Sequence, residues 1–76
     1  MSINMTDVTI HIDETLGHEQ REKIRDELLS RDGIMAVASQ DETPHLLIIE
    51  YDPDKTDPMS ILEIFRKHQI HAERLG

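Results

Sequence analysis

Histidine and carboxylate side chains are the groups in this 76-residue chain whose types and number could support chemistry. The sequence contains five His, 16 Asp and Glu residues, and no Cys. Imidazole and carboxylate ligands suit divalent transition metals such as Zn(II), Ni(II) and Cu(II), whereas Cu(I) prefers sulfur. The lack of Cys also excludes a disulfide scaffold. A divalent transition metal is therefore the cofactor that this composition can accommodate, and Cu(I) is a poor match.

His11 and His71 are the His pair that the expected fold brings closest together. If the first and last strands are antiparallel neighbours, these two residues lie opposite each other, with Cβ atoms about 4.5–5.5 Å apart. Two imidazoles at that distance can share one divalent metal ion, with Asp13 or Glu73 as oxygen ligands. His18, at the start of a predicted helix, is a third candidate ligand. The alternative is that all three His are solvated surface residues.

Four strands are predicted from the spacing of apolar residues. Alternating apolar residues predict a half-buried strand over residues 8–12, and consecutive aliphatic residues predict another over 45–51. Further strands are expected over residues 34–39 and 70–75.

Two amphipathic helices are expected between these strands. The first covers residues 18–31 and ends at Gly33, which suits the left-handed position after a helix. The second begins at Pro58 behind an Asp57 N-cap and ends near His68, whose positive charge would suit the helix dipole.

The element order β-α-β-β-α-β predicts an α+β, ferredoxin-like sandwich. Short connections and right-handed crossovers most simply give a four-stranded antiparallel sheet with both helices on one face. Residues 1–6 are expected to be a flexible N-terminus, and residues 7–76 a single domain. The predicted core consists of apolar residues on the helix-facing side, namely Val8, Ile10, Ile12, Ile24, Leu28, Ile34, Val37, Leu47, Ile49, Ile61, Phe65, Ile70 and Ala72.

Charge and motif content exclude several functional classes. The formal net charge is −8 at pH 7, and Lys and Arg alternate with acidic residues, so no nucleic-acid partner is expected. The sequence has no run of about 18 apolar residues and no apolar signal segment. We therefore expect a cytoplasmic protein without a membrane partner. The sequence contains no Gly-rich phosphate loop and no meaningful Ser–His–Asp spacing, so we do not expect an enzyme.

Several stretches resemble the heavy-metal-associated domain of copper chaperones and metal-pumping ATPases. Residues 8–12 (VTIHI) resemble the opening strand of that family, and residues 31–34 (RDGI) resemble the x-x-G-V after its first helix. Residues 49–53 (IEYDP) resemble its V-x-Y-D-P segment, and residues 61–65 with 70–72 resemble its second helix and last strand. The resemblance spans residues 7–76, and these core and turn positions imply the fold.

The metal-binding loop of that family, Met-x-Cys-x-x-Cys, has different residues here. By the spacing of the family, its Met position falls on Leu16, and its two Cys positions fall on His18 and Arg21. Arg is a permanent cation and not a ligand, and it would repel an incoming metal ion. The resemblance thus implies a domain of this family that has lost its thiolate site.

The sheet face opposite the helices is the candidate partner interface. Leu46 and Ile48 are expected to point outward there, beside Thr9 and His11. Exposed apolar patches often mark contact surfaces, although a few surface Leu and Ile residues are common in any protein.

Two functions follow from these features. The leading hypothesis is a small non-enzymatic binding module that contacts a protein partner, or a second copy as a homodimer, through the open sheet face. The alternative is a divalent metal-binding or trafficking protein that uses His11, His71 and His18.

Overall fold

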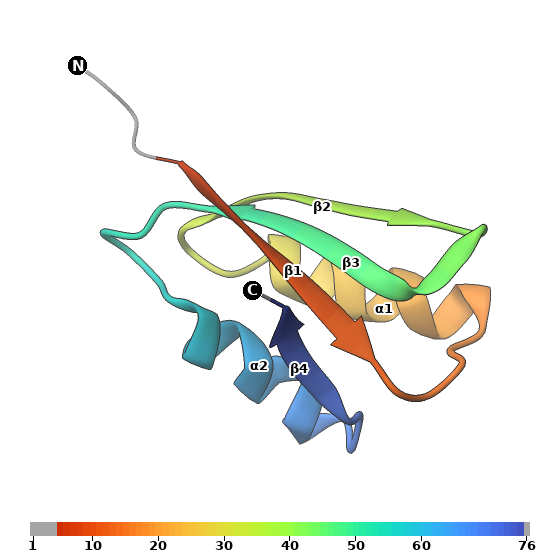
Figure 1. The fold of residues 1–76 in the computed structure, drawn as a ribbon. Coiled ribbons are helices and arrows are strands. Elements are labelled where there is room, and N and C mark those ends of the chain that lie inside the picture. Colours follow the sequence, from red (N-terminus) through yellow and green to blue (C-terminus); the bar gives the residue numbers. More distant parts are fainter. Residues whose placement is uncertain (1–4, 76) are drawn as a thin grey trace.

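The computed structural model describes residues 5–75, and its six elements follow the predicted order (Figure 1). Their bounds are β1 Thr6–Ile12, α1 His18–Leu29, β2 Ile34–Gln40, β3 Thr43–Tyr51, α2 Pro58–Lys67 and β4 Ala72–Leu75. The expected flexible segment 1–6 falls largely outside the described residues. Within them, Thr6 already belongs to β1, one residue before the expected start of the domain.

The sheet is antiparallel, with the strand order β2-β3-β1-β4, and both helices lie on one face of it (Figure 1). Helix α1 packs against β2, helix α2 packs against β4, and the two helices contact each other. The α+β ferredoxin-like fold predicted from the sequence is therefore confirmed.

The hydrophobic core lies between the sheet and the helices. Every predicted core residue is buried except Ala72, which is only partly buried because the four-residue edge strand β4 is short and open on one side. Leu16, Tyr51 and Ile64 complete the core. Leu16 lies in the loop between β1 and α1, and its side chain is buried in this core.

Element ends differ from the predicted ones by up to two residues. Helix α1 ends at Leu29, because Ser30 caps it through backbone hydrogen bonds to the preceding turn. Strand β4 begins at Ala72, because Gln69 adopts a positive φ of 60° and Ile70 N–H donates to the Phe65 carbonyl. The last strand is therefore shorter than expected, and His71 lies just before it.

The turns that bracket the helices behave as predicted. Gly33 has a φ of 94°, and a Cβ atom at this position would lie 2.8 Å from the Lys55 Cβ atom. Asp57 caps α2 by accepting a 2.8 Å hydrogen bond from Ser60 N–H, and Pro58 follows as the first helical residue. These two turns fix where each helix meets the sheet.

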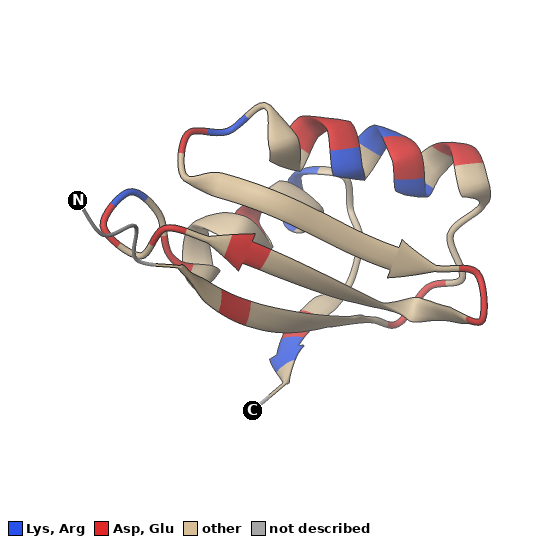
Figure 2. Cartoon of the chain, turned by 90° about the horizontal axis from the view of Figure 1, so that it is seen from above, with Lys and Arg blue, Asp and Glu red and all other residues tan. Residues whose placement is uncertain are grey.

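Charged residues are distributed unevenly over the elements. Lys and Arg alternate with Asp and Glu along α1, whereas β1, β2 and β3 contain no Lys or Arg (Figure 2). Among the residues that the structure describes, no helix has the length and apolar character needed to cross a membrane.

Candidate functional site

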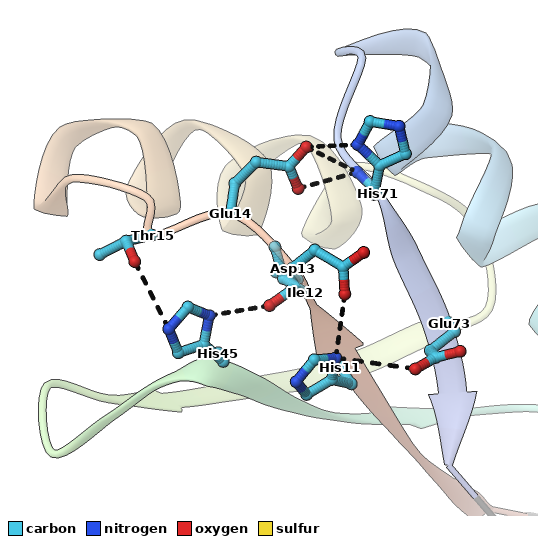
Figure 3. A network of polar contacts seen from close by, with 8 residues as sticks. All are labelled: His11, Ile12, Asp13, Glu14, Thr15, His45, His71 and Glu73. Atoms are coloured by element: carbon cyan, nitrogen blue, oxygen red, sulfur yellow. Dashed lines mark hydrogen bonds and ion pairs between the residues drawn. The ribbon is translucent and has the colours of Figure 1, made fainter.

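A cluster of His and carboxylate side chains lies where the end of β1 meets the starts of β3 and β4 (Figure 3). Its imidazoles belong to three different segments of the chain. They are His11 in β1, His45 in β3 and His71 just before β4.

His11 points toward two carboxylates. It lies opposite Glu73 in the β1–β4 register, so both side chains project from the open face. Its Nδ1 atom lies 3.5 Å from Asp13 Oδ1 and 3.8 Å from Glu73 Oε1. The candidate ligand atoms of these three residues, which we call the His11 triad, all lie within 4.8 Å of one another. The His11 Nδ1 atom is buried and makes no hydrogen bond in the described structure.

His45 supports the ring of His11. Its Nδ1–H donates a 2.8 Å hydrogen bond to the Ile12 carbonyl, which leaves Nε2 as the acceptor, 3.4 Å from the Thr15 hydroxyl oxygen. The His45 and His11 rings stack with centroids 6.1 Å apart and an interplanar angle of 22°. The sequence predicts only that His45 lies at a strand end, because no sequence pattern indicates a ring stacked across two strands.

The predicted pairing of His11 with His71 is wrong. His11 lies opposite Glu73 and Ile12 lies opposite Ala72, so His71 is two residues out of register with His11. The turn before β4, in which Gln69 has a positive φ of 60°, places His71 beside the loop after β1, where the His71 carbonyl accepts a hydrogen bond from Asp13 N–H.

His71 instead forms a clasp with Glu14. Its Nδ1 atom lies 2.6 Å from Glu14 Oε2, and its backbone N–H donates a 2.9 Å hydrogen bond to Glu14 Oε1. The side-chain hydrogen bond lowers the pKa of Glu14 below its usual value and raises the pKa of His71 above its usual value. Both effects favour the charged pair, so His71 ties β4 to the loop after β1.

His18, the third predicted ligand, does not join the His11 triad. It is exposed at the start of α1, with Nε2 3.1 Å from Glu22 Oε1 one turn along the helix. His68 caps the end of α2, as expected, and contacts Glu27 of α1 at 2.7 Å. Hydrogen bonds from His68, and then from Lys67 and Arg31, lower the pKa of Glu27 to about 2. Glu27 therefore joins the two helices.

The positions that correspond to the thiolate loop of heavy-metal-associated domains have a structural role here. Leu16 is buried in the core. The Arg21 side chain is only 12% exposed and makes a 2.6 Å ion pair with Asp41 in the turn between β2 and β3. These residues fasten α1 to the sheet and offer no soft ligand, so they do not fit Cu(I).

The open sheet face carries a row of apolar or weakly polar side chains across all four strands. Strand register places four residues side by side, in the order Ala38, Ile48, Thr9 and Leu75. We call them the open-face row. Ile48 is 47% exposed and Leu75 is 44% exposed. Leu46 lies next to the row and lines a shallow depression with Ile48 and Thr9. The outward direction predicted for Leu46 and Ile48 is therefore confirmed.

Carboxylates flank the open-face row on both sides. Asp7 and Glu50 lie opposite each other two residues along the strands in one direction, and His11 lies opposite Glu73 in the other. No Lys or Arg occupies an outward-facing position of the described strands, since Arg74 alternates to the other side. Asp7 opposite Glu50 is a like-charge cross-strand pair, which destabilises a sheet unless a cation offsets it.

Solved structures share the fold of this chain at low sequence identity. The copper binding domain from HMA7, a P-type ATPase, has 13% identity and a TM-score of 0.81, over 92% of this chain and 93% of that one. Oxidized MerP from Ralstonia metallidurans CH34 has 12% identity and a TM-score of 0.84, over 96% and 100%. The putative copper-ion-binding protein from Bacillus anthracis str. Ames has 12% identity and a TM-score of 0.82, over 95% and 100%.

No protein-family model matches this chain, and no curated protein matches it by sequence. At identities of 12% and 13%, the structural similarity shows a shared fold. The resemblance to heavy-metal-associated domains seen in the sequence is thus confirmed as a likeness of fold, in a chain that has no Cys pair.

Proposed function

We propose that this protein is a small, non-enzymatic binding module of heavy-metal-associated type whose open sheet face binds a protein partner. The observation that carries the proposal is the open-face row, flanked on both sides by carboxylates and without a Lys or Arg at any outward-facing position of the described strands. We propose a cationic amphipathic helix of the partner as the occupant of this face.

The dimensions of the open-face row support a helix. Four strands span three gaps of about 4.8 Å, so the row is about 14 Å long. A helix rising 1.5 Å per residue covers that length with about nine or ten residues. The flanking rows lie two residues away along the strands, about 7 Å on either side. A helix lying along the row would therefore place its flanking side chains above the carboxylates.

The charges support a cationic occupant. On one flank Asp7 lies opposite Glu50, a like-charge pair that Lys or Arg of a partner would stabilise. On the other flank lies Glu73. A second copy of the chain would bring further carboxylates against these, and each copy has a net charge of −8. Charge complementarity therefore favours a basic partner over a homodimer.

We do not propose copper transfer for this protein, although two of its structural neighbours are described as copper binding. The positions that would supply thiolates are His18 and Arg21 in this chain, and Arg21 is committed to its ion pair with Asp41. The cytoplasmic location expected from the sequence stays a prediction.

Chemical-shift mapping with a defined peptide tests the proposal. The probe is an amphipathic helical peptide of about 15 Leu and Lys residues, and its matched control has Glu in place of every Lys. We expect the Lys peptide to shift the amide signals of Thr9, Ile48 and Leu75 in a saturable manner, and the Glu peptide to leave them unchanged. Equal effects of both peptides, or shifts confined to the helices, would contradict the proposal.

Sedimentation equilibrium of the protein alone tests the competing occupant. We expect a monomer at concentrations where the Lys peptide binds. A dimer that dissociates in the variant Ile48→Lys would assign the face to a second copy and overturn the choice of a basic helix.

A further inference from the structure

We infer that the His11 triad, made of His11, Asp13 and Glu73, is a binding site for one divalent transition-metal ion of the Zn(II) class. This inference goes beyond the proposed function, because the site would bind a metal ion without a protein partner, although it shares Glu73 with one flank of the open-face row. It also differs in place and in ligand chemistry from a thiolate loop before α1.

The three ligands converge from separate segments of the chain (Figure 3). His11 and Glu73 are cross-strand neighbours on β1 and β4, and Asp13 follows β1 directly. A metal ligand on a strand is held in position more precisely than one on a loop. The Asp13 backbone is also fixed, since its N–H donates a 2.9 Å hydrogen bond to the His71 carbonyl.

The distances are close to those of a metal site. Ligand atoms about 2.0–2.2 Å from a tetrahedral Zn(II) lie roughly 3.4 Å from one another. His11 Nδ1 lies 3.5 Å from Asp13 Oδ1 and 3.8 Å from Glu73 Oε1. Small side-chain rotations of the two exposed carboxylates would bring all three atoms to coordinating distance and leave a fourth position for water.

The His11 imidazole has a free atom where the ion would bind. Its Nδ1 atom is buried, makes no hydrogen bond in the described structure, and is aimed at the two carboxylates. An orphaned buried nitrogen is costly unless a proton or a cation satisfies it. The stacked ring of His45, itself anchored by a hydrogen bond to the Ile12 carbonyl, restrains the orientation of the His11 ring.

The ligand set selects the class of ion. One imidazole and two carboxylates suit borderline divalent ions such as Zn(II), Co(II) and Ni(II), and they disfavour Cu(I), which requires sulfur. The carboxylates also supply two negative charges to offset the charge of the ion.

Isothermal titration calorimetry with Zn(II) at neutral pH, on the protein without a histidine tag, tests the inference. We expect one Zn(II) per chain, and at least a tenfold loss of affinity in His11→Gln and in Glu73→Gln. Matched controls are His18→Gln and His68→Gln, which remove a His beside a Glu away from the site and should change the affinity by less than twofold.

Amide spectra recorded in the same titration show that each variant is folded and locate the ion. Signals of His11, Asp13 and Glu73 should move together. Zn(II) binding that is as tight in His11→Gln as in the natural sequence, or that is lost in His18→Gln or His68→Gln instead, would overturn the site. Absence of saturable Zn(II) binding would overturn it as well.

Discussion

The two faces of the sheet differ in what their side chains do, and adjacent residues of β3 show the contrast. Leu47 is 1% exposed and packs in the core beneath the helices, whereas Ile48 is 47% exposed on the open face. Both are large aliphatic residues, and the strand alternation alone separates them. The covered face supplies the burial that stabilises the fold. The open face carries partly exposed apolar side chains such as Ile48 and the like-charge pair of Asp7 and Glu50.

The contrast between the two faces separates residues that the fold requires from residues that it does not require. Packing explains the covered face, because the residues buried in the core between the sheet and the helices are all hydrophobic. The open face is not explained by folding, since Ile48 gains little from burial there and Asp7 opposite Glu50 is unfavourable. Features that folding alone would not retain are the ones we assign to binding.

The largest expected effect is on the covered face. Leu47→Ala should lower the free energy of unfolding by about 2–5 kcal/mol, because it leaves a cavity among fully buried side chains. Urea denaturation followed by circular dichroism measures the change. The matched variant Ile48→Ala should change the free energy by no more than about 0.5 kcal/mol. Equal losses in both variants would remove the distinction between the faces.

A second expected loss of stability concerns the turn that carries the chain from α1 to the sheet. Gly33→Ala should cost about 1–2 kcal/mol of unfolding free energy, because the φ of 94° is unfavourable for a residue with a Cβ atom. The added Cβ atom would also lie 2.8 Å from the Lys55 Cβ atom, so Lys55 must shift in Gly33→Ala, and the larger side chain of Gly33→Val should increase the loss. Gly17, where a Cβ would meet nothing within 4 Å and φ is −69°, is the control, and Gly17→Ala should cost less than Gly33→Ala, limited to the weaker N-cap preference of Ala.

The helix layer should respond to acid through Glu27. Because hydrogen bonds lower its pKa to about 2 from 4.5, Glu27 stabilises the fold above about pH 4.5, and this stabilisation is lost as the pH falls toward 2. In Glu27→Gln, the drop in melting temperature between pH 5 and pH 3 should be smaller than in the natural sequence. An unchanged drop would show that the contacts of Glu27 with His68 and Lys67 do not stabilise the folded state.

The smallest expected effect is that of the Glu14–His71 clasp, because His71 is highly exposed. The raised pKa of His71 gives stability that is present below about pH 6.5 and is lost as the pH rises through the raised value. The lowered pKa of Glu14 gives stability that is present above 4.5 and lost at lower pH. The difference in melting temperature between the natural sequence and His71→Gln should therefore be greatest between these limits and vanish in alkali. A difference that persists at high pH would contradict this.

The sequence predicted the fold better than it predicted the sites. Alternation in β1, the Asp57–Pro58 helix start and Gly33 are local signals, and the structure follows each of them. The partners of His11 depended on the register of β4, which is set by the positive φ of Gln69 and the length of the turn before the strand. The observed register differs from the predicted one by two residues, so Glu73 and not His71 lies opposite His11.

The open face was predicted only in part for a related reason. Ile48 and Leu46 stand out within a strongly aliphatic strand, so their outward direction could be predicted. Leu75 and Ala38 belong to edge strands whose alternation is weak, and only register places them beside Ile48 and Thr9. The opposed pair Asp7 and Glu50 likewise depends on register, since the two residues are 43 positions apart along the chain.

The most direct measurement is a paired one on Ile48→Lys, with Met59→Lys as the control. Met59 is 69% exposed on α2, on the other side of the molecule. Met59→Lys therefore adds the same charge in place of an exposed apolar residue away from the open face. We predict that both variants keep the stability of the natural sequence within about 1 kcal/mol, and that only Ile48→Lys loses affinity for the Leu–Lys peptide, by at least about tenfold. Peptide affinity that is unchanged in Ile48→Lys, or equally reduced in Met59→Lys, would contradict a binding role for the open face.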